Sequence, residues 1–465
     1  MKREGSEKPF SQGDYYIAVL FILAILATYI LLHGIYRPYN YDDPGFLSFL
    51  YNFSTRGIDR DLVFGTTEKT GYSGVVLFGK TGGFLYGTVL EVIGWTRSHS
   101  HLISIILIAA AACCWHRFLI GAGFSARFAL FFVLLLLLLE PFFGAANQAR
   151  SDALCFFLSS LVLLLFSKRL HVCAGFFAVV AFEVHPVGIA AFFYILAAAA
   201  AGKGIAPEGP WRRIAPLLGL VVGSILGAAY YCLLHADALP LLSGTLRHGN
   251  RGGFRLAPIL SEYFFKTKYL RHLPELLLIA GSAVIFIIRG SIRRYRTVSL
   301  FFAASMLISL VIRRPNFMYM IFIYPGFLLL ILTVFETAGR LRLLMAVFLI
   351  YLLPQYAVVY FHNRDFDLDR YLTKVTAAVP ADRRTVVGNP NDWFAFKDRD
   401  FVTLDYRRGI DTLDLEEFYL IEGDDYRAGW YPKTRALVES DYELRTIGQF
   451  MERGKTIIIR KARRK

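Results

Sequence analysis

Charged residues and cysteines are both scarce in this chain. Only 19% of its 465 residues are charged, whereas 55% are hydrophobic. A soluble globular domain carries about 25% charged residues, so this composition predicts a protein that crosses a membrane several times. The few cysteines lie in or beside apolar runs and have no zinc-ligand spacing, which argues against a disulfide framework or a zinc module. They are Cys113, Cys114, Cys155, Cys173 and Cys232.

The apolar runs predict a bundle of about eleven spanning helices, because one span needs about 20 predominantly apolar residues. A break at Glu140-Pro141 interrupts the third run. We expect the spans at Tyr15–Ile35, His101–Ile120, Phe128–Ala146, Asp152–Phe166, Val172–Phe182, Pro186–Ala201, Ile214–Leu234, Leu273–Ile288, Val298–Ile312, Phe317–Phe335 and Leu341–Phe361.

Lysine and arginine are concentrated in alternate loops, and this asymmetry sets the orientation of a membrane protein. The N-terminus, with Lys2 and Arg3, and the loop that contains Arg293 and Arg294 belong to the basic set. We therefore expect a multi-pass protein of a bacterial inner or plasma membrane, with a cytoplasmic N-terminus. Orientation and contact with anionic lipids explain the cytoplasmic part of the net charge of +15, so no nucleic-acid partner is predicted.

The chain is expected to divide into two domains. Residues 1–361 form an all-α membrane domain with long external segments at 37–100 and 235–272, and residues 362–465 form a small extracytoplasmic α/β domain. Helices lying on the membrane surface are predicted at 46–53 and 84–95. In the C-terminal domain, alternating β-formers follow a helix at 368–379 and predict strands at 385–388, 401–404, 418–421 and 456–459.

Two adjacent carboxylates, Asp42 and Asp43, follow the first span directly. An acidic pair held at a membrane surface is costly unless it pairs, binds a cation or does chemistry. A carboxylate at such a position can accept the proton of an attacking hydroxyl or amine. The alternative is a solvated pair beside the turn at Pro44-Gly45.

Other polar residues are expected at the external ends of short spans, where only protein or a water-filled cavity tolerates them. Arg150 and Asp152 form a structural ion pair or bind substrate, and His185 is either a satisfied interfacial histidine or a ligand contact. Guanidinium groups match phosphate oxygens, but arginines can also anchor helices at the interface or belong to a solvated loop. The remaining candidates for phosphate binding are Lys80, Arg251, Arg255, Arg313 and Arg314.

The order of these features resembles the GT-C glycosyltransferases, in particular the group that contains the protein mannosyltransferases and the lipid A aminoarabinose transferase. Asp42-Asp43 matches the family's Asp-Glu pair, with Asp in place of Glu. Residues 78–85 resemble the stretch before the second span, without its prolines. Residues 148–154 resemble the Arg-x-Asp-x-Leu start of the fourth span. Arg314 to Tyr319, followed by Tyr324-Pro325, resembles the entry to a late span.

This resemblance, which covers roughly residues 14–360, implies an inverting transfer of a sugar from a polyprenyl-phosphate carrier to an extracytoplasmic lipid, glycan or protein. Asp42 would be the general base with Asp43 beside it, and Tyr319 would join the substrate-binding residues. No cofactor is required, because the phosphate is itself a good leaving group, although Asp42 and Asp43 could hold a divalent cation. The alternatives are a transporter or flippase of a lipid-linked anionic substrate, and a non-catalytic scaffold.

Overall fold

The structure, a computed structural model, describes residues 12–32, 42–57, 78–202, 210–236, 258–266, 272–312, 317–365, 367–403, 415–423, 438–452 and 455–465. It divides into two compact units. The first unit consists of Met1–Leu31, Ser104–Asn147 and Asp152–Tyr356, and the second of Leu32–Ile103, Gln148–Ser151 and Ala357–Lys465. The domain boundary at residue 361 remains a prediction.

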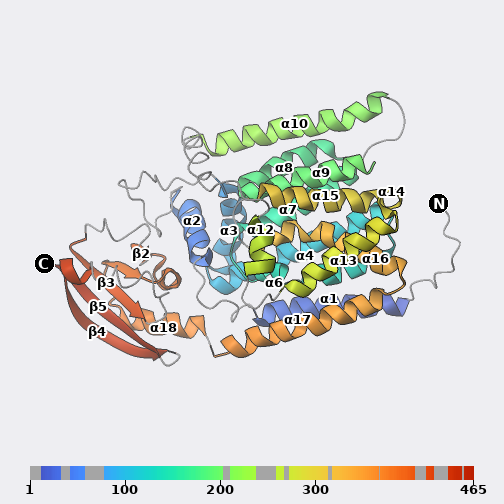
Figure 1. The fold of residues 1–465 in the computed structure, drawn as a ribbon. Coiled ribbons are helices and arrows are strands. Elements are labelled where there is room, and N and C mark those ends of the chain that lie inside the picture. Colours follow the sequence, from blue (N-terminus) through green and yellow to red (C-terminus); the bar gives the residue numbers. More distant parts are fainter. Residues whose placement is uncertain are drawn as a thin grey trace. The chain divides into compact units, whose positions relative to one another are not determined.

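Helices make up the first unit (Figure 1). Four of the described helices have an end that belongs to the second unit. These ends are Leu32 of α1, Arg97–Ile103 of α4, Ser151 of α7 and Ala357–Asn363 of α17. The helices are α1 (Gln12–Leu32), α4 (Arg97–Gly121), α5 (Ala126–Leu138), α6 (Glu140–Ala146), α7 (Ser151–Ser167), α8 (His171–Val184), η2 (Pro186–Ile189), α9 (Ala190–Ala200), α10 (Pro210–Leu234), α12 (Pro258–Ser261), η3 (Glu262–Lys266), α13 (Leu273–Ile288), α14 (Ser291–Arg294), α15 (Arg296–Val311), η5 (Phe317–Phe322), α16 (Tyr324–Thr337) and α17 (Leu341–Asn363).

Three helices among the described residues have at least 18 residues and enough hydropathy to span a membrane. A fourth is gained if α5 and α6, which bend by 68° at the expected Glu140-Pro141 break, form one span. Seven further apolar helices have 10–17 residues. About eleven spans therefore remain a prediction, and so does their orientation.

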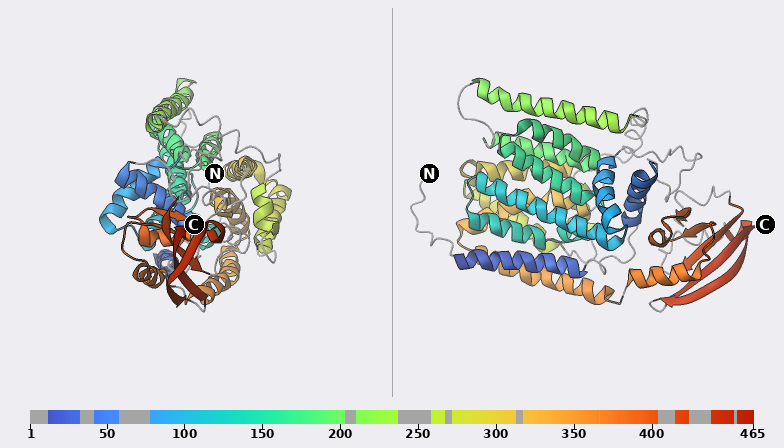
Figure 2. Two further views of the ribbon diagram at one scale, coloured as in Figure 1. Left: turned by 90° about the vertical axis from the view of Figure 1, so that its left-hand side faces the viewer. Right: turned by 180° about the vertical axis from the view of Figure 1, so that it is seen from behind.

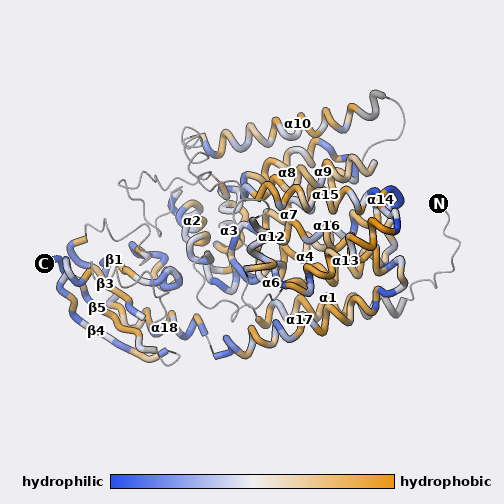
Figure 3. Tube along the Cα trace, viewed as in Figure 1, coloured by the Kyte–Doolittle hydropathy of each residue, from blue (hydrophilic) through white to orange (hydrophobic). Residues whose placement is uncertain are grey.

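Aromatic and small residues pack the first unit. Trp115 is fully buried against Phe132, Tyr194 and Phe301, with ring centroids 5.3–5.7 Å apart. Helices α8 and α10 approach so closely that a Cβ on Gly223 would collide with the Val172 carbonyl, and both views in Figure 2 show these green helices side by side. Small residues allow such close backbone contact between membrane helices. Hydrophobic residues dominate α4, α7, α13 and α16 (Figure 3).

The second unit combines helices α2 (Asp42–Arg56) and α3 (Lys80–Ile93) with the C-terminal α/β region. They confirm both helices expected between the first two spans. The placement of these two helices on a membrane surface remains a prediction. The C-terminal region contains α18 (Leu368–Ala378), β1 (Thr385–Gly388), η6 (Pro390–Asp392), α19 (Trp393–Phe396), β2 (Phe401–Thr403), β3 (Glu417–Gly423), β4 (Tyr442–Glu452) and β5 (Lys455–Arg464).

These strands form one sheet in the order β2-β1-β3-β5-β4, seen as the orange to red strands in Figure 2. β1 pairs in parallel with β2 and β3, whereas β5 is antiparallel to β3 and β4. The four expected strands are present, and β4 is an additional one. Val387, Phe418 and Leu420 belong to the buried core of the sheet, and Glu452 of β4 accepts hydrogen bonds from Arg370 and Lys374 of α18.

Candidate active site

The acidic pair lies at the start of α2, and the carboxylate of Asp43 is fully buried. It accepts hydrogen bonds from Arg97 Nε and His101 Nε2 of α4, both at 2.9 Å, and from the backbone N–H of Ala149 at 2.7 Å. Arg97 and His101 are four residues apart, so they lie on one face of α4 and reach the same carboxylate. Three donors from two distant segments therefore fix the position of Asp43.

The charge of Asp43 follows from these partners. Burial by itself raises the pKa of this carboxyl, but His101 and Arg97 lower it by more, so the pKa lies well below its usual range. The start of a helix also favours negative charge, because the free N–H groups point toward it. Asp43 is thus an ionised carboxylate with saturated oxygens, which suits an anchor better than a proton acceptor.

Asp42 is the first residue of α2, directly before this anchor. Its side chain lies outside the part of the chain that the structure describes, so its role as general base remains a prediction. Because Asp43 is tied to α4 and to Ala149, the backbone at Asp42 is held by the same three hydrogen bonds.

The segment around Arg150 meets the acidic pair through the backbone of its neighbour Ala149. Arg150 is half-buried and belongs to the same unit as Asp43. Asp152, in the first turn of α7, is 1% exposed. Lys80 begins α3 in the same unit as Asp43 and is buried, with its ammonium 5.9 Å from the centre of the Phe53 ring.

His185 and Tyr319 come together in the first unit, with His185 Nε2 3.2 Å from the Tyr319 hydroxyl. The backbone N–H of Val187 donates to His185 Nδ1, so a neutral imidazole carries its proton on Nε2 and donates to Tyr319. Four other candidate residues lie outside the described residues, and their expected roles stay predictions: Arg251, Arg255, Arg313 and Arg314.

Sequence reasoning missed Arg97 and His101, although an Arg-x-x-x-His spacing at the start of a long helix was a visible signal. It also missed two histidines in the first unit, His235 and His272, which pair with buried or partly buried carboxylates. His235 Nε2 is 2.9 Å from the fully buried Glu183. His272 lies between Glu275, at 3.2 Å, and Glu140, at 3.4 Å. Here only tertiary packing brings the partners together.

An apolar hollow of about 410 Å³ lies beside the His185 segment in the first unit. Phe182, before His185, and Ile189, after it, both line the hollow. Val179, Phe192, Phe193 and Leu196 complete its wall. Such a hollow suits a hydrocarbon chain whose polar end lies near His185 and Tyr319. Within the described residues, no group of three or more His, Cys, Asp or Glu side chains could hold a metal ion.

Comparison with solved structures finds a likeness over almost the whole chain. ArnT from Cupriavidus metallidurans in the apo state matches with a TM-score of 0.64 and 13% identity, covering 97% of this chain and 98% of that one. The same protein bound to undecaprenyl phosphate matches with a TM-score of 0.63 and 12% identity, at the same coverage. An oligosaccharyltransferase from Archaeoglobus fulgidus, in complex with Zn and sulfate, matches with a TM-score of 0.49 and 13% identity. This match covers 93% of this chain and 72% of that one.

No family model and no curated protein matches the sequence. At 13% identity the likeness concerns the fold, and it extends from the helical bundle to the C-terminal sheet because it covers 97% of the chain. The chain therefore has a fold like that of ArnT from Cupriavidus metallidurans.

Proposed function

We propose that this protein is an integral-membrane, inverting glycosyltransferase that moves a sugar from a polyprenyl-phosphate carrier to an extracytoplasmic acceptor. The observation that carries the proposal is the likeness of fold, over 97% of the chain, to a protein whose structure is known with undecaprenyl phosphate bound. The acidic pair at the start of α2 supports it, because buried donors hold that point of the chain in place.

In this proposal Asp42 is the general base and Asp43 positions it. An acceptor hydroxyl or amine attacks the anomeric carbon of the sugar, and the bond from that carbon to the phosphate oxygen breaks. Asp42 takes the proton of the nucleophile, and polyprenyl phosphate leaves with the bonding electrons. A base must be held within hydrogen-bond reach of its proton, and three hydrogen bonds to Asp43 supply that rigidity.

The donor lipid would occupy the first unit. Its hydrocarbon tail suits the apolar hollow lined by Phe182 and Ile189. Its phosphate would meet His185 and Tyr319, which come together in that unit. The other residues predicted to bind substrate are Lys80, Arg150, Asp152, Arg251, Arg255, Arg313 and Arg314. Neutralising the charge that develops on the leaving phosphate would supply much of the rate enhancement.

The test is the Asp42→Asn variant, which removes the base and keeps the side-chain size. Transfer should fall by about 10²–10⁴-fold, the usual contribution of general acid–base catalysis. Purified protein in vesicles is given a polyprenyl-phosphate sugar and the envelope fraction of a strain that lacks this protein. Release of free polyprenyl phosphate is then followed by mass spectrometry.

Asp369→Asn is the matched control, because Asp369 is an exposed aspartate of α18 away from the acidic pair. It should release polyprenyl phosphate at the wild-type rate. Asp42→Asn at the wild-type rate would overturn the assignment of the base. Movement of intact donor across the vesicle membrane, with no polyprenyl phosphate released, would instead identify a transporter.

A further inference from the structure

A second polar site lies within the second unit, where α2 meets the C-terminal α/β region. A pocket of about 310 Å³ opens there, and we call it the tail pocket. This volume is at the lower end of the roughly 300–1,000 Å³ that small-molecule sites occupy. The residues that line it include Asn52 and Arg56 of α2, Trp393 of α19, and Thr385, Asp400 and Val402 in or beside β1 and β2.

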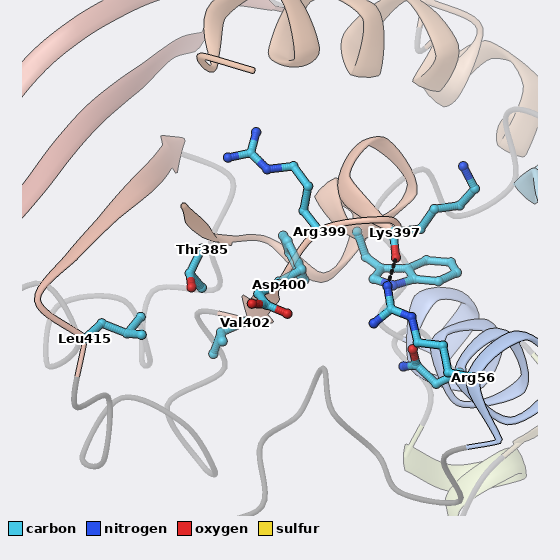
Figure 4. Close-up of a pocket in the computed structure, with 10 residues that line it drawn as sticks. Arg56, Thr385, Lys397, Arg399, Asp400, Val402 and Leu415 are labelled. Atoms are coloured by element: carbon cyan, nitrogen blue, oxygen red, sulfur yellow. Dashed lines mark hydrogen bonds between the residues drawn. The ribbon is translucent and has the colours of Figure 1, made fainter. Parts of the chain in front are cut away.

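Side-chain contacts between α2 and the C-terminal region form one side of this pocket. The hydroxyl of Tyr51 donates a hydrogen bond to Asp398, and the Tyr51 and Trp393 rings meet edge to face at 5.9 Å. Arg56 donates to the Lys397 carbonyl over 3.4 Å, the dashed line in Figure 4. The pocket is therefore a built part of the second unit.

Two polar side chains that line the tail pocket belong to residues that are largely buried. Asn52 is 5% exposed and Trp393 is 2% exposed. Neither the Asn52 amide nor the Trp393 indole N–H is hydrogen-bonded to any residue that the structure describes. An amide and an indole N–H that line a pocket are suited to a ligand that both donates and accepts hydrogen bonds.

The charges around the pocket decide between ligand classes. The Asp400 carboxylate, the Thr385 hydroxyl and the Arg56 guanidinium all line the pocket (Figure 4). Two other cations are engaged elsewhere, because Arg399 donates to the Pro380 and Arg384 carbonyls and the Lys397 ammonium donates to Asp398. A phosphate would therefore face the Arg56 guanidinium, which also donates to the Lys397 carbonyl, together with the Asp400 carboxylate.

A sugar suits the same groups better. Its hydroxyls donate to a carboxylate or an amide oxygen and accept from a guanidinium, an amide or an indole N–H. Its apolar C–H faces can rest against Trp393 and Val402. We propose that the tail pocket binds one sugar residue of the glycan acceptor. The assignment to the acceptor rests on the proposed function, whereas the binding of a sugar does not.

Direct binding is tested on the intact protein in detergent, labelled with 5-fluorotryptophan. The chain has five tryptophans, and the Trp393→Phe variant identifies the ¹⁹F resonance of Trp393. The probes are the methyl glycosides of glucose, galactose, N-acetylglucosamine and glucuronic acid, together with inorganic phosphate. At least one glycoside should shift the Trp393 resonance saturably. Asp400→Asn and Arg56→Gln should each weaken that binding about tenfold, because each removes a charged hydrogen-bonding group.

Asp400 and Arg56 are both exposed, so these variants should fold, and Asp369→Asn is the matched control that should bind like the wild type. A response to phosphate alone would overturn the inference in favour of an anion site. No saturable response to any probe would overturn it in favour of a water-filled pocket.

The acceptor assignment is tested by kinetics in the vesicle assay. Asp400→Asn should raise the KM for the acceptor about tenfold while the KM for the donor and kcat stay the same. Transfer with an unchanged acceptor KM would overturn the acceptor assignment and leave the proposed function intact. Glycoside binding without any transfer would keep the sugar site and overturn the proposed function.

Discussion

Asp43, near the start of α2, and Asp392, at the end of η6, are both fully buried carboxylates, but their surroundings differ. Asp43 accepts hydrogen bonds from Arg97, His101 and the Ala149 N–H. Among the residues that the structure describes, Asp392 accepts only from the Tyr371 hydroxyl, at 2.7 Å, and from the backbone N–H of Asn389, at 2.8 Å. No cation is hydrogen-bonded to Asp392 among the described residues.

The pKa values of the two carboxyls move in opposite directions for this reason. Burial raises the pKa of Asp392 to about 7, and its two neutral hydrogen bonds lower it only in part. Burial also raises the pKa of Asp43, but the nearby cations lower it below the usual range. Burial alone therefore does not mark a functional carboxylate. The region around α2 places cations beside its acid, whereas the turn after β1 uses its acid to close a capping box.

The largest effect is expected for Asp43→Asn, which removes the charge that balances Arg97 and His101. Breaking a buried ion pair by removing one partner costs about 3–5 kcal/mol. Amides of α2 and of residues 148–151 should lose protection in hydrogen exchange followed by mass spectrometry, because α2 loses its anchor. Adding Arg97→Gln should cost less than the sum of the two single changes. Wild-type protection in Asp43→Asn would show that the anchor is dispensable.

The next effect is a pH dependence that comes from Asp392. The pKa of Asp392 is about 7 in the folded protein, and its ordinary value is 3.8. Its contribution to the free energy of unfolding is therefore full below pH ~4 and is lost as pH rises toward about 7. The unfolding free energy of the C-terminal region should fall by roughly 4 kcal/mol over that interval. Asp392→Asn should remove this slope.

Urea unfolding followed by tryptophan fluorescence measures this slope between about pH 5 and pH 8. Asp43 stays ionised in that range and does not add to the slope. The stability that Asp43 contributes is lost only as pH falls below the ordinary pKa of an aspartate toward the lowered pKa of the folded state. The Trp393→Phe variant identifies the transition of the C-terminal region. An equal slope in the wild type and in Asp392→Asn would contradict the assignment.

The smallest effect is expected for Tyr371→Phe, which removes one hydrogen bond from Asp392. The loss should be about 1 kcal/mol, the usual net value of a neutral hydrogen bond. The pKa of Asp392 should rise further, because the Tyr371 hydroxyl lowers it, so the pH slope should extend upward. Tyr360→Phe is the control, since Tyr360 is 46% exposed, and an identical change in both variants would refute the role of Tyr371.

Local patterns in the sequence predict much of the fold because they act over a few residues. The run of β-formers at residues 456–459 becomes part of β5, and Glu140-Pro141 breaks the apolar run into α5 and α6. β4 was missed because its side chains are mostly exposed and its apolar residues do not alternate. Pairing along β5 decides that segment, since strand preference depends on context.

Part of the candidate site can likewise be predicted from the sequence, and part cannot. The position of Asp42 and Asp43 after an apolar run is visible in the sequence, and so is the resemblance of the segment around Arg150 to a family motif. The partners of Asp43 are not, because Arg97, His101 and Ala149 lie 54, 58 and 106 residues away from it. Nothing local in the sequence indicates which of these donors the carboxylate will meet.

The sequence by itself predicted a chain rich in apolar helices, a C-terminal sheet and an acidic pair after the first apolar run, since hydropathy and periodicity are properties of neighbouring residues. The tertiary structure decided which of its buried acids carry charge and where polar side chains are left to meet a ligand. Both depend on donors and cations that approach from distant segments, and the energy of a buried carboxylate is set by those partners.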